Sequence, residues 1–428
     1  MSSSNRVRKF LGAISLLIIL AVSIFAVYLS FSMGKQTNKA DPNAYVGIAF
    51  GGNTTDQAKK LIDRVESYTN LFILDSGRNP ISADQSKVEE VCDYAVGKGL
   101  YVIINLGIKN EYDSSDWFWG QPSLDGIKQQ WTQRWGDKFL GIYYNDEPGG
   151  TQLDGSWRQF YEHTIEHLGN SSFPALQSLN EIAQKLTLYV KNGTKPSPDD
   201  YELEAEFFMD YVITHDPGIE NLTAAGIRSF TSDYGLYWWD YKGGYDVMLA
   251  ELGWNVSVAE QIALVKGAAR LQDREWGTMI TWKYRSPPYL DSGDNIYNQM
   301  LISYQAGAKY IAVFNYPYEE GAYGTLTDDH FAALQRFWND ITTKQYADLS
   351  NPQAALVLPK NFGWGLRDPN DTVWGFWLTD NRTNQVAVVT AMCIYYYGVN
   401  LDIVYEDSDY PLTKVAYQKV YYWNAIAI

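Results

Sequence analysis

The chain of 428 residues has a formal net charge of −16, and 46 % of its residues are apolar. The apolar content excludes a disordered chain, and the acidic excess argues against a nucleic-acid binder, which needs a basic face. Two cysteines cannot make a disulfide framework, and four scattered histidines argue against a multi-metal site. We therefore expect buried free thiols at Cys92 and Cys393, no metal, no cofactor and no nucleic-acid partner.

The first predicted element is an uncharged, mostly apolar stretch over residues 11–33, which Arg6, Arg8 and Lys9 precede. About 20 apolar residues cross a bilayer as a helix, and a basic flank stays on the cytoplasmic side. The alternative is a cleaved signal peptide, whose apolar region is usually shorter. We therefore expect a cytoplasmic segment (1–10), a single-pass anchor in the cell membrane (11–33) and a linker (34–44). Asn-x-Ser/Thr sequons, for example at Asn53 and Asn221, fit an extracytoplasmic, glycosylated remainder.

From residue 45 onward, short apolar runs alternate with helical patterns. The predicted strands are residues 46–50, 70–74, 101–106, 139–144, 227–231, 246–252, 278–284 and 309–314. The predicted helices are residues 56–67, 82–97, 124–136, 201–214, 258–272, 296–306 and 328–341. This order is typical of a (β/α)8 TIM barrel over residues 45–345, with a polar insertion at about 149–200. A doubly wound open sheet is the alternative, although no Gly-x-Gly-x-x-Gly loop follows the first strand.

Residues 351–428 form a separate predicted unit. It has strand patterns at 354–358, 401–405 and 419–422, and a helical pattern near 385–397. These elements predict a small α/β domain that packs on the barrel.

The carboxyl ends of the predicted strands hold carboxylates, amides and aromatic side chains, and this is where barrels of this kind carry their active sites. Glycosidic bond cleavage needs one carboxylic acid to protonate the leaving oxygen and a second carboxylate to attack, to stabilise or to activate water. Aromatic faces and amides suit sugar binding. We therefore predict that substrate is bound by Asp75, Asn105, Asn145, Tyr234, Trp254, Trp282, Tyr284, Asn315 and Tyr316.

Glu147 is our first candidate for the general acid/base, and Asp146 is a close second, because both end the fourth predicted strand before Pro148. Strand alternation would place Tyr143, Asn145 and Glu147 on one face. The alternative role for Asp146 and Glu147 is to cap the next helix or to form an ion pair.

Glu251 is the best candidate for the second carboxylate, because an acid that ends an apolar strand is costly to bury unless it is partnered or used. Asp233 and Asp75 are weaker candidates, and a structural ion pair is the alternative for Glu251. The aromatic segments 117–119 and 237–241 are expected to be exposed sugar platforms, with packing onto the barrel as the alternative. The His163–His167 segment matches an inverted zinc-peptidase motif, but one short match inside the insertion favours a solvated helix face.

The segment 141–148 (GIYYNDEP) resembles the strand-four acid/base segment of the retaining TIM-barrel glycoside hydrolases, in which Asn-Glu-Pro is usual. Residues 355–364 with 401–405 are similar to the flavodoxin-like domain that follows the barrel in some β-galactosidase-type enzymes. The resemblance implies a glycosidase that acts on an oligosaccharide, a polysaccharide or a glycoconjugate.

This sequence departs from that pattern in two places. Asp146 separates Asn145 from Glu147, and the seventh predicted strand does not end in the Glu that serves as the nucleophile in that clan. Either Glu251 or Asp233 takes this role, the strand count slips, or the chain lies outside the clan, so retention and inversion both stay open. A non-catalytic carbohydrate-binding or surface-structural protein is the second hypothesis, and another barrel enzyme, such as a metal-dependent deacetylase or lyase, is the third.

Overall fold

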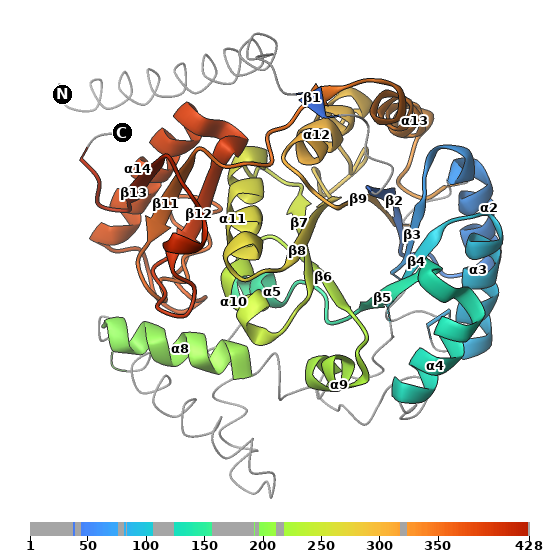
Figure 1. Cartoon of the computed structure of the whole chain (residues 1–428), viewed down its shortest axis with the longest axis horizontal. Helices are drawn as coiled ribbons and strands as arrows, with labels where there is room; N and C mark the ends of the chain where they lie inside the picture. The colour runs from blue at the N-terminus through green and yellow to red at the C-terminus, as the bar shows by residue number, and fades with distance from the viewer. Residues whose placement is uncertain are drawn as a thin grey trace, which may run out of the picture.

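The computed structural model describes residues 44–75, 81–82, 84–105, 124–155, 192, 197–210, 218–316 and 323–426, and the backbone of residues 37–38. Parallel strands close into a barrel in chain order, and β2 pairs with β9 to complete the ring (Figure 1). The barrel strands are β2 (Tyr45–Phe50), β3 (Leu71–Leu74), β4 (Tyr101–Asn105), β5 (Phe139–Tyr143), β6 (Ser229–Asp233), β7 (Val247–Leu252), β8 (Glu275–Ile280) and β9 (Tyr310–Asn315). The closed ring confirms the predicted TIM barrel and excludes an open sheet.

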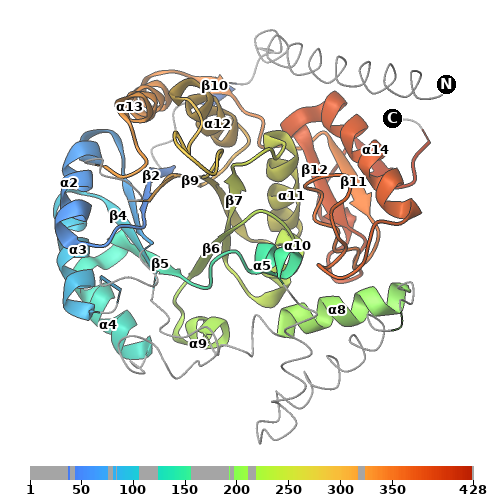
Figure 2. The same ribbon diagram turned by 180° about the vertical axis from the view of Figure 1, so that it is seen from behind.

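Helices surround the ring on its outside, as the views from both ends show (Figures 1 and 2). They are α2 (Thr55–Val65), α3 (Gln85–Gly97), α4 (Leu124–Trp135), α9 (Gly218–Ala225), α10 (Tyr237–Gly243), α11 (Val258–Leu271), α12 (Gly293–Gln305) and α13 (Asp328–Thr343). The helix α5 (Pro148–Asp154) lies at the start of the region predicted as an insertion, and α8 (Pro198–Asp210) begins three residues before the predicted helix 201–214. The short strands β1 (Thr37–Asn38) and β10 (Tyr346–Ala347) pair antiparallel. Single 3₁₀ turns cover Glu66–Tyr68, Gly136–Lys138, Gly398–Asn400 and Leu412–Lys414.

The interior of the barrel is a packed core rather than a pore. Side chains that alternate along the strands fill it, namely Ala49, Leu71, Ile73, Ile103, Tyr143, Phe230, Val247, Leu249, Met279, Tyr310 and Ala312. The intervening strand residues point outward into the layer between strands and helices. The strands approach closely at Gly47, where a Cβ atom would lie 1.8 Å from the carbonyl oxygen of Leu71, so only glycine fits there.

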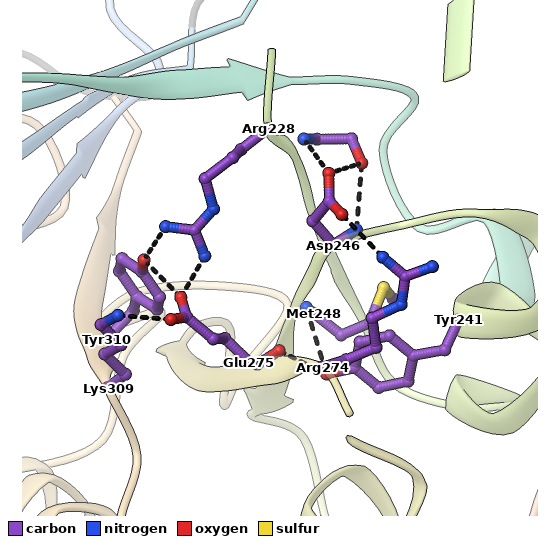
Figure 3. Close-up of polar contacts among 9 residues, drawn as sticks. Arg228, Tyr241, Asp246, Met248, Arg274, Glu275, Lys309 and Tyr310 are labelled. Atoms are coloured by element: carbon purple, nitrogen blue, oxygen red, sulfur yellow. Dashed lines mark hydrogen bonds and ion pairs between the residues drawn. The ribbon is translucent and has the colours of Figure 1, made fainter. Parts of the chain in front are cut away.

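A network of charged groups closes the amino-terminal end of the barrel (Figure 3). The carboxylate of Glu275, at the start of β8, accepts hydrogen bonds from Arg228, Lys309 and the Tyr310 hydroxyl. Burial opposes the ionisation of Glu275, but the hydrogen bonds from Lys309 and Arg228 prevail and lower its pKa. In the same view, Asp246 accepts a hydrogen bond from Arg274 at 2.7 Å. This end of a TIM barrel serves stability rather than catalysis.

We expect Glu275→Gln to lower the free energy of unfolding by about 1 kcal/mol, because the amide keeps the shape but loses a charge that three donors share. Urea unfolding at pH 7 measures the change. Glu220→Gln, which alters an exposed residue of α9, is the matched control and should leave the stability unchanged. Equal stability of the two variants would contradict a stabilising role for the network.

The C-terminal part of the chain is a small parallel sheet with one helix. Its strands β11 (Ala354–Leu358), β12 (Leu401–Tyr405) and β13 (Lys419–Tyr422) lie in the order β12-β11-β13, and α14 (Asn381–Tyr397) accompanies them. A flavodoxin-like order also begins with its second, first and third strands. The identity of this unit as a flavodoxin-like domain, and the division of the chain at residues 345 and 351, stay predictions.

The small sheet packs against α11 of the barrel (Figure 2). A Cβ atom at Gly267 would lie 2.5 Å from the carbonyl oxygen of Ile403, so helix and strand meet without room for a side chain. Beside this contact, the buried Lys266 ammonium lies 3.4 Å from the buried Asp402 carboxylate, and Arg270 donates to the same carboxylate at 2.9 Å. The helix α11 is therefore covered on both sides, by the barrel and by the small sheet.

The structure corrects two predictions, for the aromatic segment 237–241 and for the seventh strand, and confirms the buried free cysteines. The aromatic segment 237–241 is not an exposed platform: it forms α10, whose Trp239 is buried between Trp374 and Tyr405 at ring distances of 4.6 and 4.4 Å. The predicted seventh strand (278–284) is observed three to four residues earlier, as β8, because Trp276 and the residues after it carry the ladder. Both cysteines are free and buried, as predicted.

The structure contradicts the predicted localisation at a cell membrane. No helix among the residues that the structure describes is long and apolar enough to cross a membrane. The predicted anchor itself (11–33), the aromatic segment 117–119 and the segment His163–His167 lie outside the described residues.

Candidate functional site

The carboxyl end of β5 makes a sharp turn that presents two acidic side chains. Asn145 and Glu147 both have left-handed backbone conformations, with φ of 48° and 50°, and Pro148 begins α5 directly afterwards. The regular alternation therefore ends at Tyr144, which lies in the outer layer, whereas Tyr143 lies inside the barrel. The turn leaves Asp146 exposed and Glu147 partly buried.

The carboxyl groups of Glu147 and Glu251 form a coupled pair at the end of the barrel. Glu251, near the end of β7, is 5 % exposed, and its Oε1 atom accepts a hydrogen bond from the Ser232 hydroxyl at 2.7 Å. Its Oε2 atom has no hydrogen-bond partner among the described groups. The interaction between the two carboxyls lowers the pKa of Glu147 and raises that of Glu251, so the two groups compete for protons.

Burial, together with the charge of Asp146, raises the pKa of Glu147 to about 7, whereas the interaction with Glu251 opposes the shift. Burial also raises the pKa of Glu251 well above its usual range, and the charges of Glu147 and Asp146 act in the same direction. The pair therefore keeps a proton near neutral pH. This is the state that a general acid needs.

Two further predicted residues lie beside the pair. Asp75, after β3, accepts a hydrogen bond from the side chain of Asn105 at 2.8 Å. Burial, together with the charges of Asp146 and Glu147, raises the pKa of Asp75 to about 7, so Asp75 lies within electrostatic reach of both residues. Asp146 accepts a hydrogen bond from the Tyr143 hydroxyl.

Asp233 has a different position from the other predicted acids. Its fully buried carboxylate accepts hydrogen bonds from the backbone amides of Gly149 and Gly150 at 2.5 and 2.8 Å, and from those of Tyr234 and Gly235. Burial raises the pKa of Asp233, and the amides of Gly149, Tyr234 and Gly150 oppose the rise. These contacts tie the first turn of α5 to the end of β6, which is the helix-capping role that the sequence left open for Asp146 and Glu147.

The predicted aromatic residues gather at the ends of β7, β8 and β9. The ring of Trp282 lies 5.5 Å from Phe314 and 6.0 Å from Tyr316. Trp254 and Tyr284 are 39 % and 45 % exposed, and the backbone amide of Trp254 donates to the carbonyl of Trp282. Exposed aromatic faces next to carboxylates can stack on sugar rings.

Three other predicted residues have mainly structural contacts. Tyr234 donates to Asp154 at 2.7 Å, on the far end of α5. The backbone carbonyl of Asn145 accepts from the Thr231 hydroxyl at 2.7 Å. Asn315 is 2 % exposed and accepts from Thr325.

Sequence reasoning missed Ser232 and the hydroxyl function of Tyr143. Both are buried inside the barrel, and their oxygen atoms lie 2.8 Å apart. A serine in a strand pattern gave no signal of its own. The available signal was that Ser232 and Tyr143 are polar groups among inward-facing apolar residues, which require a partner.

The raised pKa of Glu147 also predicts a dependence of stability on pH. The folded state binds this proton more tightly than the unfolded state, so the stabilisation is complete below the unfolded pKa of about 4.5 and is lost as the pH rises through about 7. We expect Glu147→Gln to be more stable than the wild type at pH 8, by on the order of 2 kcal/mol, and nearly equal to it at pH 4. Urea unfolding at both pH values measures this difference, and an equal stability at pH 8 would contradict the buried charge.

The described residues contain no group of three or more His, Cys, Asp or Glu side chains with an arrangement that could hold a metal ion. Two acidic residues of the candidate site, Asp146 and Glu251, instead contact the hydroxyl groups of Tyr143 and Ser232.

No protein-family profile matches this chain, and no curated protein sequence matches it. Solved structures share its fold. The GH5_18 protein from Streptomyces cattleya, in complex with GlcNAc, has a TM-score of 0.50 and 11 % identity over 91 % of this chain and 99 % of that chain. The polyextremophilic β-galactosidase from the Antarctic haloarchaeon Halorubrum lacusprofundi has a TM-score of 0.49 and 11 % identity over 88 % of this chain and 68 % of that chain. The GH5_18 structure and this chain therefore share the TIM-barrel fold.

Proposed function

We propose that this protein is a glycoside hydrolase in which Glu147 and Glu251 are the catalytic carboxylates. The observation that carries the proposal is the coupled carboxyl pair at the carboxyl end of the barrel, in which Glu147 has a pKa of about 7. A partly accessible acid that keeps its proton near neutrality, next to a second carboxylate, is the arrangement that glycosidic cleavage requires.

In the proposed reaction, Glu147 gives its proton to the glycosidic oxygen as the bond between that oxygen and the anomeric carbon breaks. Glu251 either removes a proton from the water that attacks the anomeric carbon or attacks this carbon itself. In both routes one water is consumed, and Glu147 regains its proton before the next cycle. The carboxyl separation is about 5–5.5 Å in retaining and about 6.5–9.5 Å in inverting enzymes, so this distance in a substrate complex would distinguish the two routes.

The proposed substrate is an oligosaccharide, a polysaccharide or a glycoconjugate. Stacking faces would come from Trp254, Tyr284 and the rings of Trp282 and Tyr316. On the opposite side of the ring of strands, Asp75 and Asn105 would bind sugar hydroxyls. Barrel residues 45–345 would carry the whole site, and the small unit of residues 351–428 would support it through α11.

A second candidate is a non-catalytic carbohydrate-binding protein. One observation favours it: the end of β8 holds Thr281 and Trp282 and no glutamate. In this case the pair would bind sugar hydroxyls, and the aromatic residues would keep the same role.

The test is a screen of the full chain on aryl glycosides and polysaccharides, beside Glu147→Gln and Glu251→Gln. Aryl N-acetylglucosaminides belong in the screen because the Streptomyces cattleya structure contains GlcNAc. Loss of hydrolysis in both variants, with Glu220→Gln unaffected, supports the proposal. Hydrolysis that neither variant alters would overturn it, and saturable sugar binding without hydrolysis would support the second candidate.

A further inference from the structure

Two buried hydroxyl groups connect an exposed carboxyl with a buried one. Tyr143 contacts Asp146, the Tyr143 and Ser232 oxygens lie 2.8 Å apart, and Ser232 lies 2.7 Å from Oε1 of Glu251. Asp146 is exposed, whereas Glu251, Tyr143 and Ser232 are almost completely buried. The chain of contacts therefore runs from solvent into the barrel.

A count of protons shows what these contacts require. Each of the three oxygen–oxygen contacts needs one proton to be a hydrogen bond, but the two hydroxyls supply only two. If both carboxyls are ionised, the Tyr143 and Ser232 hydroxyls donate outward, and their oxygens face each other at 2.8 Å without a proton. One additional proton, on either carboxyl, makes all three contacts hydrogen bonds.

The lone pairs of the Tyr143 oxygen allow the hydroxyls to donate in either direction along the three contacts. The backbone amide of Ser232 donates to the Tyr143 oxygen at 3.1 Å, and this leaves one lone pair of that oxygen for either Asp146 or the Ser232 hydroxyl. With the proton on Asp146, each hydroxyl donates toward Glu251. With the proton on Glu251, each hydroxyl donates toward Asp146.

We propose that Tyr143 and Ser232 form a proton relay that holds one proton between Asp146 and Glu251 and carries it between them. A transfer reverses both hydroxyls: Glu251 gives its proton to Ser232, Ser232 gives its own to Tyr143, and Tyr143 gives its own to Asp146. Each hydroxyl breaks one O–H bond and forms another, so the net change is one proton moved from the buried carboxyl to the exposed one.

In the proposed glycosidase this relay has a specific use. A proton that Glu251 removes from water would leave the buried site through Ser232 and Tyr143 to Asp146 and solvent, and Glu251 would be ionised again. The titratable groups that face the relay are Asp75 on β3, Asp146 and Glu147 after β5, and Glu251 on β7. The use in catalysis rests on the proposed function, but the relay itself does not.

The relay is tested without any substrate by infrared spectroscopy of the full chain, which detects the carbonyl band of a protonated carboxyl. The wild type should show a deuterium-sensitive band at neutral pH. Because Glu147 and Asp75 also have pKa values of about 7, the relay is identified by the direction in which the variants below shift the band. Tyr143→Phe removes the oxygen that opposes Ser232 and leaves the Ser232–Glu251 bond complete without an additional proton. The pH midpoint of the band should therefore fall by about one unit.

Ser232→Ala should act in the opposite direction, because it removes the donor to Glu251 and so favours the protonated carboxyl. Ser232→Thr keeps the hydroxyl and should restore the wild-type midpoint. Tyr241→Phe is the matched control, because the Tyr241 hydroxyl is also buried but bonds to the carbonyl of Glu275, at the other end of the barrel. A general loosening of the barrel would shift the Tyr143 and Ser232 variants in the same direction.

Absence of the band in the wild type would overturn the relay, and so would shifts of equal sign in Tyr143→Phe and Ser232→Ala. The wild-type measurement does not depend on whether any variant folds. Because no sugar is present, a failure of the relay leaves the glycosidase proposal standing. A wild type that shows the expected band and shifts but hydrolyses no glycoside would overturn the glycosidase proposal and leave the relay standing.

Discussion

Glu147→Gln is expected to lower kcat/KM by about 10²–10⁴-fold on glycosides with an alkyl leaving group, and far less on glycosides with a nitrophenyl leaving group. In the proposed reaction, an alkoxide is a poor leaving group that takes the proton of Glu147, whereas a nitrophenolate leaves without one. The raised pKa of about 7 explains why Glu147 still holds this proton near neutral pH. Wild-type activity on alkyl glycosides should therefore fall as the pH rises above about 7.

The comparison with Glu251→Gln separates the two roles. The second carboxylate acts at the anomeric carbon or on the attacking water, so its loss should slow both substrate types to a similar degree. The measurement is kcat/KM on both types for the wild type and the two variants. If Glu147→Gln slows both substrate types equally, Glu147 is not the general acid.

Asp402→Ala is expected to lower the free energy of unfolding by about 3–5 kcal/mol, the range for breaking a buried ion pair by removing one partner. Lys266 is 1 % exposed and would retain a buried charge without its carboxylate. Burial already lowers the pKa of Lys266, and Asp402 is the group that opposes this shift. The variant removes this opposition at the contact between α11 and the small sheet.

Urea unfolding followed by circular dichroism measures this effect. Asp294→Ala breaks the ion pair between Asp294 and Arg336. The Asp294 side chain is 81 % exposed, so this change should lower the free energy of unfolding by at most about 1 kcal/mol. The double change of Asp402→Leu with Lys266→Met removes both buried charges and should recover most of the loss. A single Asp402→Ala variant as stable as Asp294→Ala would show that the small sheet does not depend on the buried pair.

The barrel was predictable because its signal repeats. Apolar runs and amphipathic helices alternate, and the closed ring follows from their number and spacing. The boundary of β8 was harder, because Trp276 and Trp282 are both aromatic and periodicity alone does not show which of them lies in the ladder. The burial of α10 stayed only an alternative for a related reason. The residues that cover the segment 237–241, Trp374 and Tyr405, lie far along the chain.

For the candidate site, the sequence could indicate which acids stand at strand ends but not how they interact. Left-handed conformations at Asn145 and Glu147 end the strand alternation, and nothing in a periodic pattern reveals them. The capping contacts of Asp233 depend on the path of α5, and a list of the residues at strand ends does not show that path. The link from Ser232 to Glu251 joins neighbouring strands and becomes visible only once the barrel closes.

The closure of the barrel by β2 and β9 has a consequence for how such a site can evolve. A closed ring of parallel strands delivers the last residues of all its strands to one circular rim, so neighbouring positions on that rim face the same space. A carboxylate at the end of β7 can then reach the same reacting carbon as one at the end of β8, with no change of backbone. Functional residues can therefore migrate around the rim by exchanges of single side chains, while the ring that supports them is inherited intact.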